Sequence, residues 1–192
     1  MLVCCFLDIF RHMKMVICSW GCLIILCFQS VFGQKKEAGP VIKDFGKVWN
    51  VQNADYPTKT GQEFKVVFDV MNSPDNPSQR NASIETAARF LNMHAQSGVP
   101  VAQLHVALVV HNKASKDLIT NEAYQNRFGI DNPNAEMIAQ LLDADVDILF
   151  CGQSSISRNF PKNELIPGVQ LALSAMTALI QLQNEGYSFI KF

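Results

Sequence analysis

The sequence predicts a three-layer α/β/α domain built on a mainly parallel sheet of about five strands. Two observations support this fold class. Short apolar runs alternate along the chain with longer segments in which apolar residues recur at helical spacing. The short runs are also almost continuously apolar, which is typical of strands in a parallel sheet that is covered by helices on both faces.

The first 33 residues are predicted to be a secretory signal peptide and not part of the fold. Arg11 and Lys14 precede an apolar run over residues 15–28, and Val31 and Gly33 stand where a cleavage before Gln34 needs modest or small side chains. A retained membrane anchor is the alternative, but the run is shorter than the roughly 20 apolar residues of a spanning helix. We therefore expect an exported protein, periplasmic or secreted, with no membrane span after cleavage.

Removal of this segment would leave the mature chain with a single cysteine. Five of the six cysteines lie in the first 33 residues, and Cys151 is the only one in residues 34–192. The mature chain therefore has no intramolecular disulfide, and it carries an unpaired thiol into an oxidising compartment. The alternative is that Cys151 is an inert, buried small apolar residue.

Composition and motifs exclude several function classes. The net charge is −1 without a basic stripe, so nucleic acid is not an expected partner. No metal site is expected, because one cysteine and scattered histidines lack the paired spacing of zinc ligands. No phosphate-binding glycine motif follows the first strand, so no cofactor is expected. Ser154 and Ser155 lack the G-x-S-x-G elbow of a serine hydrolase.

The mature chain is expected to start with an extended N-terminal arm over residues 34–61. This stretch is polar, with scattered glycine and proline, and its aromatic residues Phe45, Trp49 and Tyr56 follow no helical period. We expect these side chains to hold the arm against the body or against a neighbouring subunit. A disordered linker is the alternative, although linkers rarely carry this many aromatic residues.

The α/β domain is expected over residues 62–192, and its first half is well patterned. Residues 64–70 are rich in β-branched and aromatic side chains and predict a strand, as do residues 104–110. Residues 82–96 between them predict a helix that stops at Gly98 and Pro100. The apolar side chains of this helix share one face: Ile84, Ala87, Ala88, Leu91 and Ala95.

The second half continues the alternation. Residues 115–128 predict one helix ended by Gly129, and Asn132-Pro133 opens another with a buried stripe. The buried stripe of this second helix consists of Met137, Ile138, Leu141 and Leu142. Residues 154–165 predict a loop with a helical turn at most. The remaining elements are strands over 146–150, 169–173 and 187–192 and a helix over 174–184, in which Met176, Leu179, Ile180 and Gln183 recur with helical period.

The predicted functional site lies where the parallel strands end. Cys151 follows the strand over 146–150, and Gly152 lets the backbone turn there. Ligands and reacting groups gather beyond the carboxyl ends of such strands, so the residues that follow three strands form one rim. The expected rim residues are Asp69, Asn72, Asn112, Gly152, Gln153 and Ser154, around Cys151 and His111 as the reacting pair.

Cysteine reacts as the thiolate, so its pKa of about 8.5 must fall for chemistry near neutral pH. A nearby imidazolium, or the N–H groups of a turn after the strand, would lower it. His111 is the only histidine placed to help, since His94 lies in a predicted helix and His105 in a predicted strand. The alternative is that His111 only bonds to backbone at the rim.

Several segments of the chain together form a recognisable pattern: Cys151-Gly-Gln-Ser-Ser155, Leu165-Ile-Pro-Gly-Val169, Leu171-Ala-Leu-Ser-Ala-Met-Thr177, Gln183-Asn-Glu-Gly-Tyr187, Val67-Phe-Asp-Val70 and Val109-Val-His111. They resemble the DsrE/DsrF-like family of small sulfur-relay proteins, from about Phe64 to the C-terminus and most closely an exported branch. The resemblance implies a DsrEF-like fold, assembly into homo- or hetero-oligomers, and a cysteine that carries persulfide sulfur between partners; by motif match that role falls on Cys151. The sulfur relays of the family are cytoplasmic, whereas this chain is expected to be exported.

Three functional hypotheses follow, and the sequence leaves open whether the protein is an enzyme. In the first, Cys151 carries or transfers sulfur, tuned by His111 and the Gly152–Gln153 backbone, with a donor or acceptor protein or a small sulfur compound as partner. In the second, the protein is a non-catalytic, homo-oligomeric binding or assembly module of the cell envelope, and Cys151 is structural. In the third, the rim binds a small ligand without a covalent step.

Overall fold

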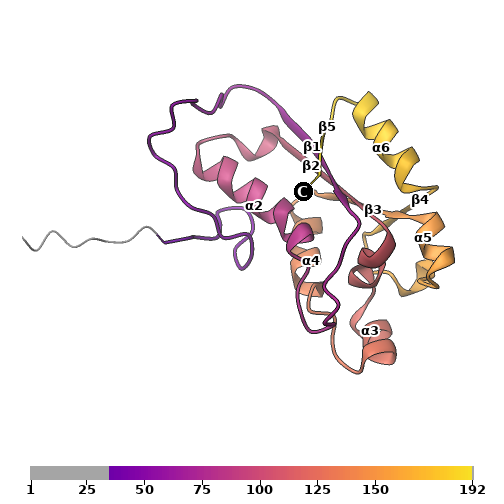
Figure 1. Cartoon of the computed structure of the whole chain (residues 1–192). Coiled ribbons are helices and arrows are strands. Elements are labelled where there is room, and N and C mark those ends of the chain that lie inside the picture. Colours follow the sequence, from indigo (N-terminus) through magenta and orange to yellow (C-terminus); the bar gives the residue numbers. More distant parts are fainter. Residues whose placement is uncertain (1–34, 192) are drawn as a thin grey trace, which may run out of the picture. The chain divides into compact units, whose positions relative to one another are not determined.

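The computed structural model describes residues 35–191, which lie in one compact unit. A five-stranded sheet runs through it in the order β4-β3-β2-β1-β5, and every neighbouring pair is parallel (Figure 1). The parallel α/β prediction is therefore confirmed. The strands are β1 (Phe64–Val70), β2 (Leu104–Val110), β3 (Asp147–Cys151), β4 (Gln170–Ala172) and β5 (Ser188–Ile190).

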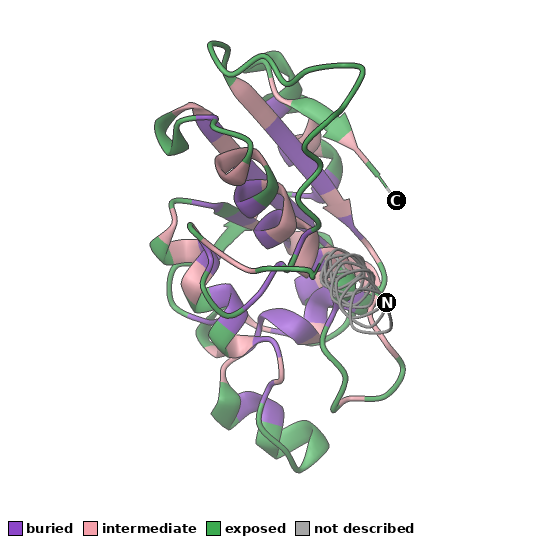
Figure 2. Ribbon diagram, turned by 90° about the vertical axis from the view of Figure 1, so that its left-hand side faces the viewer, coloured by how far each residue is buried: buried purple, intermediate pink, exposed green. Residues whose placement is uncertain are grey.

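Helices cover both faces of the sheet. Val66 and Phe68 of β1 point into the larger core, which α2 (Ala82–Gln96) and α4 (Ala135–Asp143) close. Val67 points the opposite way, into a smaller core under α6 (Ala175–Asn184). Because successive side chains of a strand alternate between faces, one apolar run supplies both cores. Figure 2 shows buried residues along the strands and on the sides of the helices that face them.

The register aligns the strand ends. Val70 pairs with Val110, Val110 with Phe150, and Cys151 with Ala172. The segments that follow β1, β2 and β3 therefore leave the sheet at one edge, as the rim prediction requires.

The predicted single helix over 115–128 is wrong. The chain forms a 3₁₀ segment, η2 (Asn112–Leu118), then an extended break, and then α3 (Asn121–Phe128). The break forms because Ile119 makes an antiparallel bridge with Leu165. Thr120 then caps α3 by accepting a hydrogen bond from the Ala123 N–H.

The predicted loop over 154–165 is also more regular than expected. Helix α5 (Gly152–Ser157) begins directly after Cys151, and the 3₁₀ segment η3 (Lys162–Glu164) follows. A further 3₁₀ turn, η1 (Val101–Gln103), leads into β2. The early start of α5 places the first turn of a helix against the thiol.

Residues 35–61 contain no helix or named strand and are held by Asn92 of α2. The Asn92 carboxamide accepts from the Ile42 N–H at 2.9 Å and donates to the Ile42 and Phe45 carbonyls. Gly46 lies so close to α2 that a Cβ there would come within 2.4 Å of the Ala88 backbone. Phe45 is buried, while Trp49 and Tyr56 are exposed.

Within residues 35–191, no helix combines the length and apolar character needed to cross a membrane. The predicted signal peptide over residues 1–33 and the first residue of the predicted arm, Gln34, lie outside the described residues.

Candidate functional site

The thiol of Cys151 lies at the junction of a strand and two helices. Cys151 is the last residue of β3 and the N-cap of α5. Gly152 makes this junction compact, because a Cβ at this position would lie 2.6 Å from the Ala172 carbonyl oxygen of β4. Only a residue without a side chain lets the two backbone segments approach so closely.

Hydrogen-bond donors converge on the sulfur atom. Burial raises the pKa of the Cys151 thiol, but the nearby backbone N–H and hydroxyl of Ser154 act against burial and lower it. The nearby backbone N–H groups of Ala175 and Gln153 lower it further. The pKa of Cys151 therefore lies below the ordinary value of a cysteine. The negative charge of a thiolate is met by amides at the start of α5 and at the first residue of α6.

The Ser154 hydroxyl is itself held in place. The backbone N–H of Asn112 donates to Ser154 Oγ at 3.0 Å, so the hydroxyl proton is left to point at the sulfur. Asn112 has a left-handed backbone with φ of 54°, and its side-chain oxygen accepts a hydrogen bond from Arg158. Asn112, two residues after the end of β2, thus orients the Ser154 hydroxyl near the thiol at the end of β3.

His111 is held by a different partner. Its Nε2 bonds to Asp69 Oδ1 at 2.7 Å, and Lys191 Nζ lies 2.7 Å from Asp69 Oδ2. The Asp69 side chain is almost fully buried, and each of its two carboxylate oxygens lies beside a basic group. The groups that lower the pKa of Cys151 are amides and a hydroxyl, and His111 is not among them.

The other predicted rim residues divide into two sets. Asn112, Gln153 and Ser154 surround the thiol. Asn72 lies apart, where its carbonyl accepts from the Asn81 side chain at 2.8 Å. Its surroundings belong to a second polar centre.

That second centre is the carboxylate of Asp117 in η2, which sequence reasoning missed. Burial raises the pKa of Asp117. The carboxylate accepts hydrogen bonds from Ser73, Asn81 and Asn134 at 2.7–3.1 Å. This network ties together the segments that follow β1 and β2. In the sequence this network shows only as a set of asparagines in turn segments. These asparagines follow no periodic pattern, so they do not stand out.

The thiol lies just below an apolar surface. Cys151 is only 5% exposed, in a core that includes Val67, Val109 and Ala175. Among residues 35–191, no three His, Cys, Asp or Glu side chains gather closely enough to hold a metal ion.

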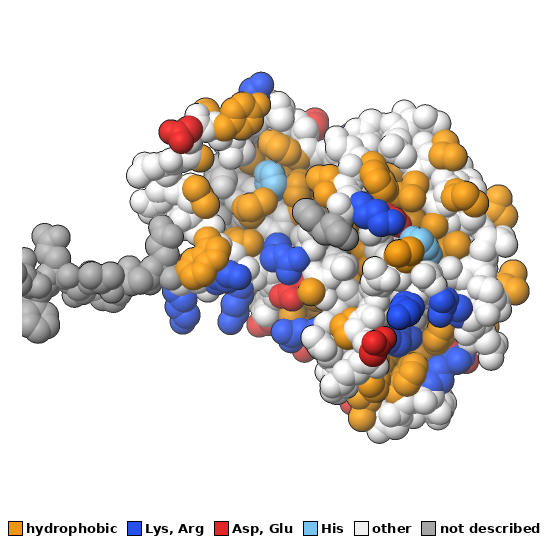
Figure 3. Space-filling model, in the orientation of Figure 1, with side chains coloured by type: hydrophobic (Ala, Val, Ile, Leu, Met, Phe, Trp, Pro, Cys, Tyr) orange, Lys and Arg blue, Asp and Glu red, His pale blue; other side chains and the backbone are white. Residues whose placement is uncertain are grey.

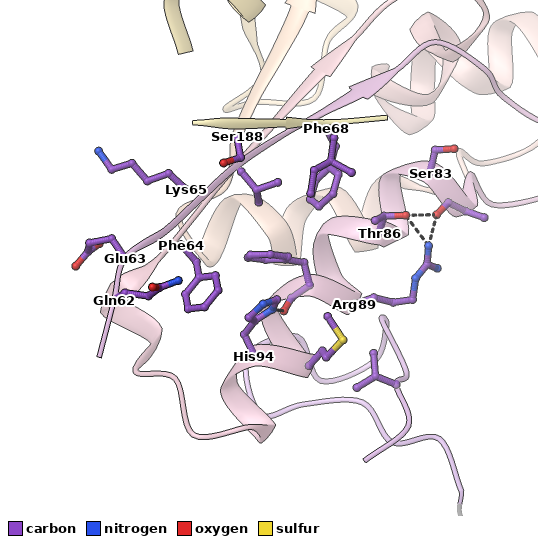
Figure 4. Close-up of a pocket in the computed structure, with 16 residues that line it drawn as sticks. Gln62, Glu63, Phe64, Lys65, Phe68, Ser83, Thr86, Arg89, His94 and Ser188 are labelled. Atoms are coloured by element: carbon purple, nitrogen blue, oxygen red, sulfur yellow. Dashed lines mark hydrogen bonds between the residues drawn. The ribbon is translucent and has the colours of Figure 1, made fainter. Parts of the chain in front are cut away.

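A groove of about 990 Å³ lies elsewhere, between α2, β1 and β5 (Figure 4). Phe64 and Phe90 flank the His94 ring, with centroid distances of 4.8 and 4.0 Å. The floor of the groove includes Val66 and Phe68, which point away from the core that contains Cys151. A molecule in this groove would be separated from the thiol by the sheet.

Comparisons with solved structures agree with the overall fold. A protein of unknown function from Methanobacterium thermoautotrophicum, MTH1491, matches with 15% identity and a TM-score of 0.52, over 68% of this chain and 100% of its own. The ychN protein of E. coli matches with 17% identity and a TM-score of 0.50, over 67% of this chain and 99% of its own. At these identities the likeness establishes the fold.

No curated protein matches the chain. The family model described as "DsrE/DsrF-like family" matches residues 65–192, which include all five strands except Phe64, the first residue of β1, together with Cys151 and the donors around its sulfur. The chain belongs to the DsrE/DsrF-like family.

Proposed function

We propose that this protein carries sulfur as a persulfide on Cys151, as a sulfur-relay or thiol-dependent sulfur-transfer protein. Membership of a family associated with sulfur relay supports this proposal. The observation that carries it is the convergence of the Ser154, Gln153 and Ala175 donors on the sulfur atom, which favours the thiolate.

The proposed reaction needs no external oxidant. The Cys151 thiolate attacks the outer sulfur of a donor persulfide, a new S–S bond forms at Cys151, and the donor leaves as a thiolate. In the second half, an acceptor thiolate attacks the outer sulfur of Cys151, and Cys151 leaves as a thiolate. The donors around the sulfur act in both halves, because they stabilise the attacking and the leaving anion.

His111 and Asp69 complete the proposed rim. Asp69 orients the His111 ring, and Lys191 adds a second basic group beside it. We propose that these basic groups attract the anionic sulfur of a donor and supply a proton at the rim. The donor and acceptor are proteins or small sulfur compounds, and the site of action is the periplasm or the exterior, after removal of residues 1–33.

A specific observation also favours a second candidate function. Cys151 is 5% exposed and packs with Val67 and Val109, as a structural cysteine would. In that case the protein is a non-catalytic, oligomeric binding or assembly module of the cell envelope. Reactivity of the thiol in the native protein separates the two candidates.

The test is intact-mass spectrometry after incubation of the native chain with inorganic polysulfide, followed by removal of excess donor. We expect a gain of one sulfur atom that dithiothreitol reverses. The Cys151→Ser variant is the control and should gain none. No gain on the native protein, with Cys151 still alkylated after unfolding, would favour the assembly module.

A further inference from the structure

The groove between α2, β1 and β5 is large enough to hold a small molecule. Its volume of about 990 Å³ lies at the upper end of the range for ligand sites, roughly 300–1,000 Å³. The groove is separate from both polar centres described above. The sheet lies between it and Cys151, and its lining contains no residue of the Asp117 network.

Apolar and aromatic side chains form most of the surface of the groove. Phe64, Val66 and Phe68 occupy alternate positions of β1 and therefore share one face of the sheet. From α2, the Phe90 ring meets Phe68 edge-on at 5.9 Å, and Met93 is 44% exposed. On the face that Figure 3 draws, hydrophobic side chains surround a histidine in the region of α2 and β1. Such a surface favours a ligand with an apolar body.

The groove is elongated, with polar groups at its two ends. Its α2 lining residues lie within residues 82–94, a stretch of helix about 18 Å long. Figure 4 shows Arg89 and Thr86 toward one end, Glu63 and Lys65 toward the other, and aromatic rings between them. A long apolar chain with one polar end matches this arrangement better than a compact ring.

The Arg89 end offers a fixed positive charge. Nη2 of Arg89 donates to the Ala82 carbonyl at 3.0 Å and to the Thr86 hydroxyl at 2.5 Å. Within residues 35–191, the carboxylate that pairs with Arg89 is that of Glu85, at 4.0 Å from Nη1. Glu85 also accepts a hydrogen bond from the Gly46 N–H at 3.0 Å. The guanidinium is therefore held in position while its charge is only weakly compensated.

The charges at the opposite end are already balanced. Glu63 carries the carboxylate of the described lining, and its Oε2 lies 2.6 Å from His105 Nε2. Lys65 lies beside it in sequence, and its Nζ donates to the Glu185 carbonyl at 3.4 Å. An anionic group is thus favoured at the Arg89 end, and the charge complementarity gives the ligand a direction in the groove.

We propose that the groove binds a free aliphatic carboxylate, with its carboxylate on Arg89 and its chain against Phe68, Phe90 and Met93. A guanidinium matches a carboxylate in shape and charge, and the apolar side chains remove the alkyl chain from water. This inference goes beyond the proposed sulfur chemistry and stands without it, because the sheet separates the groove from the thiol.

The test is equilibrium dialysis of the native chain against hexanoate, octanoate and decanoate, with the bound ligand measured by mass spectrometry. We expect one molecule of decanoate per chain. The dissociation constant should fall by about two- to fourfold for each added CH₂ group, because each is buried in the groove. Decyltrimethylammonium has a chain of the same length with a positive head, and it should bind at least tenfold more weakly than decanoate.

Two variants locate the ligand, each with a matched control. Arg89→Gln should weaken decanoate binding by about tenfold or more, whereas Lys113→Gln, which removes a positive charge from an exposed position outside the groove, should not. Met93→Glu places a carboxylate against the alkyl chain and should also weaken binding. Met176→Glu makes the same change on α6, where Met176 is 72% exposed, and should leave binding unchanged. Far-ultraviolet circular dichroism checks that each variant folds.

Four results would overturn the proposal. They are no binding of decanoate, equal affinity for hexanoate and decanoate, binding of decyltrimethylammonium as tight as that of decanoate, and loss of binding in Met176→Glu but not in Met93→Glu. The last result would place the chain on α6. Cys151→Ser should bind decanoate as the native chain does. A protein that binds decanoate but takes up no sulfur would contradict only the proposed function, and the reverse result only this inference.

Discussion

Asn112 and Ser154 connect the ends of two strands: the Asn112 backbone N–H donates to the Ser154 hydroxyl oxygen at 3.0 Å. The hydroxyl in turn lowers the pKa of Cys151, so a residue that follows β2 influences a thiol that ends β3. This connection makes the reactivity of the thiol sensitive to one small side chain.

Replacing Ser154 by alanine should raise the pKa of Cys151, because one donor to the thiolate is lost while the burial that opposes ionisation remains. Since a hydrogen bond to a charged group contributes about 1.5–3 kcal/mol, and about 1.4 kcal/mol is a tenfold change in the thiolate fraction, we expect alkylation by iodoacetamide at pH 7 to slow by about tenfold or more. The measurement is the alkylation rate against pH. Ser157→Ala, at an exposed position of the same helix, is the control. An unchanged profile would mean that the hydroxyl does not act on the sulfur.

Replacing Gly152 by alanine should destabilise the junction between β3, β4 and α5. The added Cβ would lie 2.6 Å from the Ala172 carbonyl oxygen, which is backbone and cannot rotate away. We expect a loss of about 1–3 kcal/mol in the free energy of unfolding, measured by urea denaturation. Gly61→Ala is the matched control, because a Cβ there meets nothing within 4 Å. Equal stability of the two variants would contradict the close approach.

Replacing Asn92 by alanine should release the segment 35–61 from α2. The buried carboxamide makes hydrogen bonds to Ile42 and Phe45, and the variant leaves these backbone groups without their partner. We expect faster cleavage of this segment in limited proteolysis and a loss of about 2–4 kcal/mol in unfolding free energy. Asn126→Ala, at an exposed helical position, should change neither quantity. Unaltered proteolysis of Asn92→Ala would show that the segment is held by other contacts.

Tyr124 should make stability depend on pH in the alkaline range. Burial and the nearby Asp117 charge raise the pKa of Tyr124 to about 12, above its ordinary value of 10.0, so the fold favours the neutral phenol. This contribution is complete below pH 10 and is lost as the pH rises toward 12. Between pH 9 and pH 11.5 the unmodified protein should lose about 2 kcal/mol more stability than Tyr124→Phe.

Tyr124→Phe also removes the hydroxyl that donates to the Pro77 carbonyl at 2.7 Å, so the variant should be slightly less stable at pH 9. Urea denaturation at the two pH values measures both effects. Parallel losses of stability in the two proteins would show that Tyr124 titrates at its ordinary value.

Strong local patterns predicted much of the fold. The apolar runs over 64–70 and 104–110 and the helix over 82–96 have the predicted bounds, because one periodicity dominates each of them. The break at Ile119 could not be predicted, since it depends on a bridge to Leu165, far along the chain. In α6, apolar residues lie on both sides, so the pattern over Met176 and Ile180 could not identify the side that meets the sheet.

The position of the candidate site could be predicted from the sequence, but the interactions that tune its thiol could not. Parallel topology is sufficient to bring Asp69, His111 and Cys151 to one edge of the sheet. The donors to the sulfur are backbone N–H groups, which every residue has and which no sequence pattern distinguishes. The bond between His111 and Asp69 is a side-chain orientation, which depends on the packed structure.

The ion pair between Lys191 and Asp69 has a practical consequence for handling the protein. A basic side chain from the end of the chain lies on a carboxylate that is almost fully buried. Losing or chemically modifying the Lys191 amine would therefore disturb the neighbourhood of His111 even though it alters no residue near the sulfur. Lysine-directed labels should be avoided on this protein, and samples should be checked for intact mass before their reactivity is compared.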